Sequence, residues 1–386
     1  MYTSRSTFVF RNRRFQVRQR RRGIATATPQ QLQKPSPVVP RLHKTPAGAA
    51  PNPRKPGNSF PAEYSHITRY SFDFSTVTNA KMAASTSTSV HPVADAFSTS
   101  GSSGLYEKAR PSYPPESLSK IFTAFHKSAG NGNDRAGINI VELGAGTGIF
   151  TRLLISPPET TPQLPQINKI VAVEPGPGMR EGFISALTSK NIPVGTAGTS
   201  GAEKVQILHG AFDSIPVEDG WADGVVIAQA FHWAHGHYAN ALKEIARVLK
   251  PGAPLVLIWN LEDRRIPDFH PWVAKIRDIY EQYEKGTPQY RLGWWKVIFE
   301  LPEYKELYEE KYEEYETVRT LSATVDAVVE RILSKSYITA LDEEEKVKVE
   351  KSVREILETE RKQWDDEGKG VFKYPYATDV YVIWRK

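Results

Sequence analysis

Short apolar runs alternate with segments of helical period through the middle of the chain. The runs end in a glycine turn, an acid or an aromatic loop, and the amphipathic segment 241–252 stops at a Pro-Gly pair. Strands that alternate with helices in this way form a mostly parallel sheet with helices on both faces. The runs that predict these strands are residues 141–143, 170–174, 205–208, 223–233 and 254–259.

Beyond residue 260 the pattern changes, because longer helical segments separate the strand patterns that follow. Aromatic and branched residues recur there at helical spacing, and two segments favour strands. Strands are expected at 317–320 and 376–384, and helices at 268–285, 323–335 and 343–364. The pattern therefore predicts a helical insertion before the last strand.

The first strand pattern runs directly into a glycine turn. Gly144, Gly146 and Gly148 stand at alternate positions after Glu142. Glycine can turn sharply without a Cβ clash, and it lets a ligand approach the backbone at the start of the next helix. A dinucleotide fingerprint would need a small residue where the chain has Ile149. The spacing therefore indicates a nucleoside-bearing cofactor and disfavours a nicotinamide-dependent oxidoreductase.

Three further motifs follow the glycine turn in order. Glu174 ends the second strand pattern, where a carboxylate can accept hydrogen bonds from both ribose hydroxyls. Asp213 lies in the turn 210–216, which follows the third strand pattern. The fourth strand runs into the aromatic loop 231–233, at the edge of an open α/β sheet where ligands bind.

In this order the motifs resemble those of class I S-adenosylmethionine-dependent methyltransferases. The resemblance implies a Rossmann-like, seven-stranded, mostly parallel sheet with helices on both faces and a helical insertion before the last strand. It covers residues 96–386, with the core motifs at 138–260 and a helical lid or insertion within 262–370. The implied cofactor is S-adenosyl-L-methionine, with Glu174 at its ribose and Asp213 at its adenine amino group.

The segment before the core motifs narrows the resemblance. Tyr106 precedes Arg110-Pro-Ser-Tyr-Pro, which is similar to the entry segment of trans-aconitate methyltransferase-like small-molecule enzymes. The run 229–233 fits the same branch, in which the entry segment folds over the cofactor. The residues expected to contact the acceptor are Phe231, His232 and Trp233. The residues implied in cofactor binding are Tyr106, Arg110, Glu142, Gly144, Ala145, Gly146, Gly148, Glu174, Pro175, Met179, Asp213 and Ala230.

The predicted activity is methyl transfer to a small-molecule acceptor, at a carboxylate or hydroxyl oxygen. A hydroxyl acceptor benefits from a general base, for which His232 is the candidate catalytic residue. A carboxylate needs no base, and His232 and Trp233 would then be pocket walls. Arg319 and Lys335 are candidates to pair with a carboxylate substrate. A nicotinamide-dependent oxidoreductase and a non-catalytic methyltransferase-like binding protein are the alternatives.

Charge is distributed unevenly along the chain. The 386 residues contain 50 Lys and Arg against 44 Asp and Glu, a net charge of +6. Residues 1–81 alone hold 15 bases against two acids, so the rest of the chain is mildly acidic. A nucleic-acid partner would require a basic face on the folded part, and is not expected. Neither a membrane span nor a metal site is expected, because apolar runs are short and the three neighbouring histidines lack ligand spacing.

The first 95 residues are rich in Pro, Ser, Thr, Ala and Arg and show no sustained period. Such a segment is expected to be a disordered basic tail. Eight arginines among the first 22 residues resemble a mitochondrial presequence, which would place the protein in the matrix. Met82 reads alternatively as an ordinary start, which would favour the cytoplasm. The acceptor's identity and the oligomeric state are left open.

Overall fold

The computed structural model describes Val93 and residues 102–129, 137–161, 164–199, 203–266, 268 and 270–386. These residues fall in one structural unit, residues 81–386. The tail predicted for residues 1–95, with its presequence pattern, lies outside the described residues apart from Val93.

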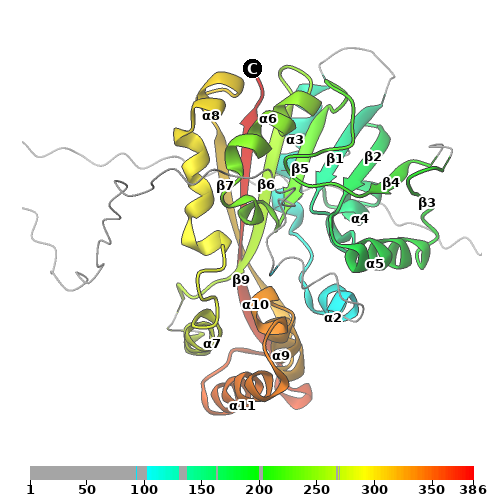
Figure 1. The fold of residues 1–386 in the computed structure, drawn as a ribbon. Helices are drawn as coiled ribbons and strands as arrows, with labels where there is room; N and C mark the ends of the chain where they lie inside the picture. The colour runs from blue at the N-terminus through cyan, green and yellow to red at the C-terminus, as the bar shows by residue number, and fades with distance from the viewer. Residues whose placement is uncertain are drawn as a thin grey trace, which may run out of the picture. The chain divides into compact units, whose positions relative to one another are not determined.

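Nine strands of the described chain form one sheet in the order β3-β4-β2-β1-β5-β6-β9-β7, with β8 paired to β9 (Figure 1). Strands β1 to β6 are parallel, and β9 runs antiparallel to β6 and β7. All seven predicted strands are present, and the short strands β3 and β8 add to them. The strands are β1 (Ile138–Leu143), β2 (Ile167–Val173), β3 (Val194–Gly195), β4 (Val205–Leu208), β5 (Gly224–Ala228), β6 (Pro254–Glu262), β7 (Glu313–Ala323), β8 (Trp364–Asp366) and β9 (Val371–Trp384).

Helices cover both faces of the parallel strands, which explains why those strands are apolar on both sides. Successive residues of β1 show this, since Ile140 packs into one core and Val141 into the other. The helices of the first core are α6 (Tyr238–Val248), α8 (Pro302–Leu307) and the 3₁₀ helix η4 (Trp294–Glu300). Those of the second are α3 (Pro115–Ser128), α4 (Ile149–Ile155) and α5 (Pro177–Thr188). Helix α2 (Ser102–Ala109) precedes them along the chain.

A third core belongs to the helical insertion. It gathers buried residues of α7 and of the helices between β7 and β9 around the first residues of β9, Phe372, Tyr374 and Tyr376 (Figure 1). The helices are α7 (Pro271–Glu281), α9 (Val325–Leu333), α10 (Ser336–Thr339) and α11 (Glu343–Thr359). Because β6 pairs antiparallel with β9, its last residue lies opposite Tyr376. The insertion therefore stands beside the carboxyl edge of the parallel strands.

The three helices predicted beyond residue 260 all end earlier than their patterns indicated, and the largest difference is in α11. Helix α11 stops at Thr359, and Trp364 begins β8, which pairs with Phe372. The ring of Trp364 meets the edge of Phe372 at 5.8 Å, a contact that local periodicity does not reveal. No helix of the described residues is long and apolar enough to cross a membrane.

Candidate active site

The glycine turn after β1 forms the floor of a pocket at the carboxyl edge of the sheet. The amides of Gly144 and Ala145 donate to the Val173 carbonyl at 2.8 and 3.2 Å, which ties the turn to β2. A Cβ on Gly144 would lie 2.6 Å from the Cβ of Ala230. A Cβ on Gly146 would have only Tyr106 within 4 Å, at 3.8 Å. Gly146 therefore leaves its backbone open to the pocket.

Four of the residues implied in cofactor binding lie outside the main pocket lining, namely Glu142, Ala145, Gly148 and Asp213. Gly148 caps α4 with φ +79°, and a Cβ there would lie 2.8 Å from both Leu187 and Phe183. Its absent side chain therefore serves helix packing. Glu142 and Ala145 line a smaller cavity beside the pocket. Burial raises the pKa of Glu142 to about 8, although a hydrogen bond from Thr151 at 2.5 Å opposes the shift.

Glu174 sits at the end of β2 with both oxygens directed at the glycine turns. Oε2 accepts from the amide of Gly146 and Oε1 from the amide of Gly176, each at 2.9 Å. Burial raises the pKa of Glu174, and the two amides oppose the shift. A carboxylate has about four acceptor sites, so each oxygen can still accept from a ribose hydroxyl. Pro175 and Met179 line the pocket beside it.

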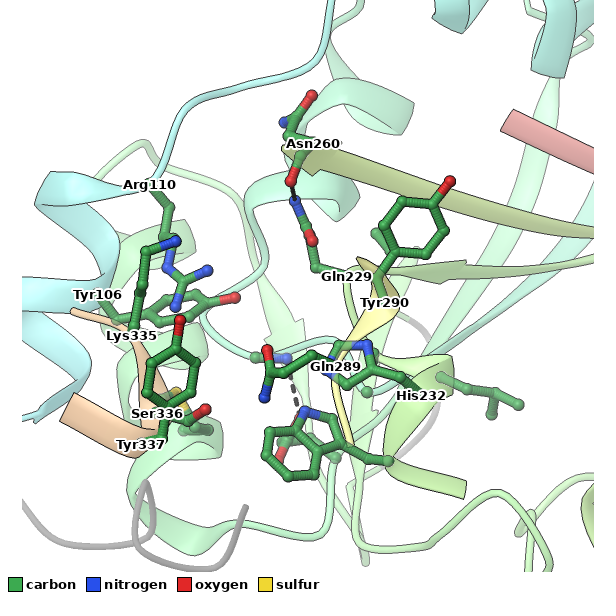
Figure 2. Close-up of a pocket in the computed structure, with 18 of the residues that line it drawn as sticks. Tyr106, Arg110, Gln229, His232, Asn260, Gln289, Tyr290, Lys335, Ser336 and Tyr337 are labelled. Atoms are coloured by element: carbon green, nitrogen blue, oxygen red, sulfur yellow. Dashed lines mark hydrogen bonds between the residues drawn. The ribbon is translucent and has the colours of Figure 1, made fainter. Parts of the chain in front are cut away.

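The entry segment covers one wall of the pocket. The guanidinium of Arg110 lies 4.6 Å from the ring centroid of Tyr106, and its Nη2 donates to the Ser334 carbonyl at 2.8 Å. Both residues line the pocket, and in Figure 2 they lie beside Lys335 and Tyr337. The segment after α2 thus connects the core motifs to the helical insertion.

Asn260 of β6 holds this entry segment in place. Its Nδ2 donates to the carbonyls of Pro111 and Ser112 at 3.4 and 3.1 Å, and its Oδ1 accepts from Thr378 at 2.5 Å. The Asn260 carbonyl accepts from Nε2 of Gln229 at 2.9 Å (Figure 2). Gln229 has φ +60°, an unusual value for a residue other than glycine that is typical of functional sites.

The aromatic loop after β5 divides between core and pocket. Phe231 is fully buried against Phe212 and does not line the pocket, so its predicted acceptor contact is wrong. His232 and Trp233 do line it. The indole N–H of Trp259 donates to Nδ1 of His232 at 3.3 Å. Trp259 is fully buried and stacks on Tyr290 at 4.4 Å, so this donor cannot turn away.

Asp213 lies next to the pocket without lining it, whereas the adjacent Ala211 and Phe212 do. Its Oδ2 is 4.0 Å from Nδ1 of His237. Arg319, on β7, also lies outside the lining and donates to the Ser112 carbonyl. Lys335 is buried and belongs to the lining.

Several polar lining residues were not predicted from the sequence. Most come from the loops and helices after β6, where the sequence shows no strand-end motif to identify them. Gln229 could have been found, because it follows a predicted strand. The residues concerned are Gln229, Asn260, Glu281, Glu284, Gln289, Tyr290, Arg291, Arg331, Ser336 and Tyr337.

Comparison with known proteins agrees with this geometry. A family model described as a methyltransferase domain matches residues 141–257. An uncharacterized methyltransferase-like protein of Schizosaccharomyces pombe is 35% identical over 257 residues, covering 66% of this chain and 83% of the relative. The chain is a class I S-adenosylmethionine-dependent methyltransferase. An uncharacterized methyltransferase of Mycobacterium tuberculosis is 30% identical over 275 residues, covering 71% of this methyltransferase and 90% of the relative.

The cofactor of this methyltransferase is S-adenosylmethionine, and the pocket residues fit it. The open backbone at Gly146 and the spare acceptor sites of Glu174 suit the methionine and ribose parts. Tyr106 and Arg110 stand where the entry segment meets the glycine turn. The family assignment decides against the nicotinamide-dependent alternative.

Proposed function

We propose that this methyltransferase acts on an oxygen atom of a small molecule, as in the trans-aconitate methyltransferase-like branch that its entry segment resembles. The observation that carries the proposal is the origin of the lining beyond the cofactor residues. Tyr280, Lys335 and Tyr337 come from the helical insertion and line the same pocket as Gly146 and Glu174. A pocket walled by both parts suits a small molecule better than a polymer.

The chemistry needs little from the protein beyond position. Bound S-adenosylmethionine supplies a methyl group on a sulfonium, so an acceptor lone pair forms the new bond to carbon while the electrons of the broken C–S bond stay on sulfur. The chain's own contribution is to orient the acceptor and to exclude water, which can supply much of the acceleration. Trp233 and Tyr290 provide apolar walls for that purpose.

His232 fits a positioning role better than the role of a general base. A neutral imidazole has one protonated nitrogen and one acceptor nitrogen. Because the indole of Trp259 can only donate, Nδ1 of His232 is the acceptor and Nε2 carries the proton. His232 therefore offers an N–H to the acceptor oxygen. If Nδ1 took up a proton as well, its N–H would face the N–H of Trp259, and this disfavours His232 as a base.

The proposal is tested by measuring S-adenosylhomocysteine release from S-adenosylmethionine with a panel of small acids and phenols, and in parallel with RNA and protein. We expect release above the blank for members of the small-molecule panel. Release with RNA or protein alone would contradict the proposed acceptor class.

A further inference from the structure

Two buried cations of the helical insertion line the pocket. Arg331 of α9 is 4% exposed and Lys335, which follows α9, is 7% exposed. Both reach the carboxylate of Glu262, which is fully buried at the end of β6. Nη2 of Arg331 lies 3.0 Å from Oε1, and Nζ of Lys335 lies 3.1 and 3.2 Å from the two oxygens. The hydroxyl of Tyr280 donates to Oε2 at 3.2 Å.

Positive charge exceeds negative charge around this carboxylate. Arg110 is a third cation beside the pair, and its Nη2 binds only the neutral carbonyl of Ser334. Below about pH 7, where Lys335 keeps its proton, three cations therefore surround the single charge of Glu262, and above that pH Arg110 and Arg331 still exceed it. Buried ions are normally paired, so this surplus requires an explanation.

The other charged residues of this region do not remove the surplus, because they pair among themselves. Arg277 donates to Glu281 at 2.6 Å, and Arg291 binds Glu284. Two cations are thus matched by two acids. The surplus stays with Arg110, Arg331 and Lys335.

Unused donors point to where an anion would bind. Nε and Nη1 of Arg331 are buried without a hydrogen-bond partner among the described residues, and so is Nε of Arg110. A buried donor without a partner is costly, and a donor on a charged group more so. Arg331 lines the pocket, so an oxygen of a bound ligand can satisfy it.

The cofactor does not supply the missing negative charge. S-adenosylmethionine carries a carboxylate, an ammonium and a sulfonium, so its binding adds one positive charge to the pocket. We propose that Arg331 and Lys335, with Arg110 beside them, bind a carboxylate of the acceptor, and that this carboxylate anchors the acceptor without receiving the methyl group. The inference rests on the proposed function, because it assigns a chemical class to that small molecule.

The anchoring role follows from the nature of the reaction. A nucleophile that attacks a sulfonium loses negative charge, so cations held against it stabilise the starting state more than the transition state. Lys335 and Arg110 occupy one side of the pocket in Figure 2, and His232, Gln289 and Tyr290 the other. A second oxygen of the acceptor, facing His232, is therefore the nucleophile. Its lone pair forms the bond to carbon, and a hydroxyl would release its proton to solvent.

The cation pair also predicts a pH dependence. Burial lowers the pKa of Lys335 to about 7, assisted by Arg331 and opposed by Glu262. An adjacent carboxylate favours the charged amine, so the acceptor binds more weakly as pH rises from 7 to 9 and Lys335 loses its proton. The charged and titratable groups that face this cluster are Arg110, Glu262, Tyr280, Arg331, Tyr337, Tyr374 and Tyr376.

The first test uses the full chain, labelled S-adenosylmethionine and the small-molecule fraction of a cell extract, divided on an anion exchanger at pH 8. We expect methylation only from the retained fraction, with products that are still retained because the anchor keeps its charge. Label from the unretained fraction alone, or in a product that is no longer retained, would overturn the inference while leaving the proposed function intact. Label confined to macromolecules would overturn both.

The second test separates acceptor binding from cofactor binding. Lys335→Met should raise the KM for the retained acceptor fraction about tenfold or more and leave the Kd for S-adenosylhomocysteine within about twofold. Lys335→Arg should restore the KM. Lys296→Met, which removes an exposed cation outside the pocket lining, is the matched control and should change neither value.

A weaker affinity for S-adenosylhomocysteine with an unchanged acceptor KM would show that Lys335 serves the cofactor's carboxylate, and would overturn the inference. If Lys335→Met does not fold, the pH dependence of the acceptor KM of the wild-type enzyme tests the same anchor. Its acceptor KM should rise between pH 7 and 9, and a KM that stays constant over that range would contradict the anchor.

Discussion

At Gly146 the absence of a side chain leaves room for the methyl-donor cofactor. The φ of +56° at this glycine already disfavours other residues, and its Cβ position faces open pocket. We expect Gly146→Val to weaken S-adenosylhomocysteine binding by more than about a hundredfold, because the branched side chain would occupy the cofactor's path. Isothermal titration measures this directly.

The control must carry the same backbone strain without touching the pocket. Gly220 has φ +60°, nothing within 4 Å of its Cβ position and no place in the pocket lining. Gly220→Val should lose stability by roughly 1–2 kcal/mol and bind S-adenosylhomocysteine normally. Normal affinity in Gly146→Val would refute the placement of the cofactor.

Glu142 makes a prediction about stability and pH. Its pKa is about 8 in the folded protein, against a usual 4.5, because burial disfavours the charged form. Between these values the folded state holds a proton that the unfolded state has released, so the acid's contribution to stability falls as pH rises. Glu142→Gln mimics the protonated form and does not titrate.

Urea denaturation at pH 5 and pH 8 tests this difference. The free energy of unfolding of Glu142→Gln, relative to wild type, should shift in the variant's favour by about 1 kcal/mol or more between the two pH values. Glu218→Gln, at an exposed acid, is the control and should show no such shift. If Glu142→Gln also showed no shift in its relative free energy of unfolding, Glu142 would already be charged at neutral pH.

His232 allows the roles of donor and base to be distinguished. Gln keeps an N–H donor but cannot take up a proton. If His232 only positions the acceptor oxygen, His232→Gln should lower kcat by less than about tenfold. Loss of a general base costs about 10² to 10⁴ in rate. Steady-state kinetics with S-adenosylmethionine and the acceptor distinguish the two roles. A loss of kcat in the larger range would show that His232 acts as a general base.

At the scale of elements, Asn260 connects the end of β6 to the entry segment. Asn260→Ala removes the bonds to Pro111, Ser112 and Thr378 and should cost about 1–3 kcal/mol of stability. Because Tyr106 and Arg110 flank that segment, the Kd for S-adenosylhomocysteine should rise several-fold. Thermal melts and titration measure the two effects.

Asn168→Ala provides the comparison, because Asn168 is exposed and its Nδ2 donates to Oδ1 of Asn139 at 2.9 Å, at a distance from the pocket lining. It should change neither stability nor affinity appreciably. An unaltered affinity in Asn260→Ala would show that the entry segment holds its position without β6.

The parallel strands and the residues at their ends were largely predictable from the sequence. Strands buried on both faces appear as continuous apolar runs, so β1, β2, β4, β5 and β6 were predictable. The positions of Glu174 and Gly144 in the pocket lining were predictable too, because each follows its strand directly in the chain. Glu262 ends β6 in the same way and could have been identified by the same rule.

The acceptor side of the pocket was harder to predict. Lys335 meets Glu262 across 73 positions of sequence, and no local period connects a cation in a helical insertion to the end of a strand. Arg319 and Lys335 are similar as sequence signals, yet only Lys335 enters the pocket. The acceptor contact expected of Phe231 could not be judged from the sequence for a related reason, because its place in the core depends on packing against Phe212 and Tyr238.

At the scale of the whole molecule, the two halves of the fold supply different parts of one site. The parallel strands and their turns provide most of the lining residues implied in cofactor binding, and the insertion beside them (Figure 1) provides further cations and aromatic rings of the lining. The surplus positive charge is therefore local to the pocket, while residues 82–386 as a whole are mildly acidic. Such a distribution suits a small anionic acceptor better than nucleic acid.

The size of the methylated product shows whether this methyltransferase modifies a small molecule. The full chain is incubated with cell extract and S-adenosylmethionine labelled in its methyl group, and the labelled products are separated by size. We predict label in molecules below about a kilodalton, which a pocket walled by the insertion can admit. Label found only in RNA or protein would contradict a small-molecule acceptor.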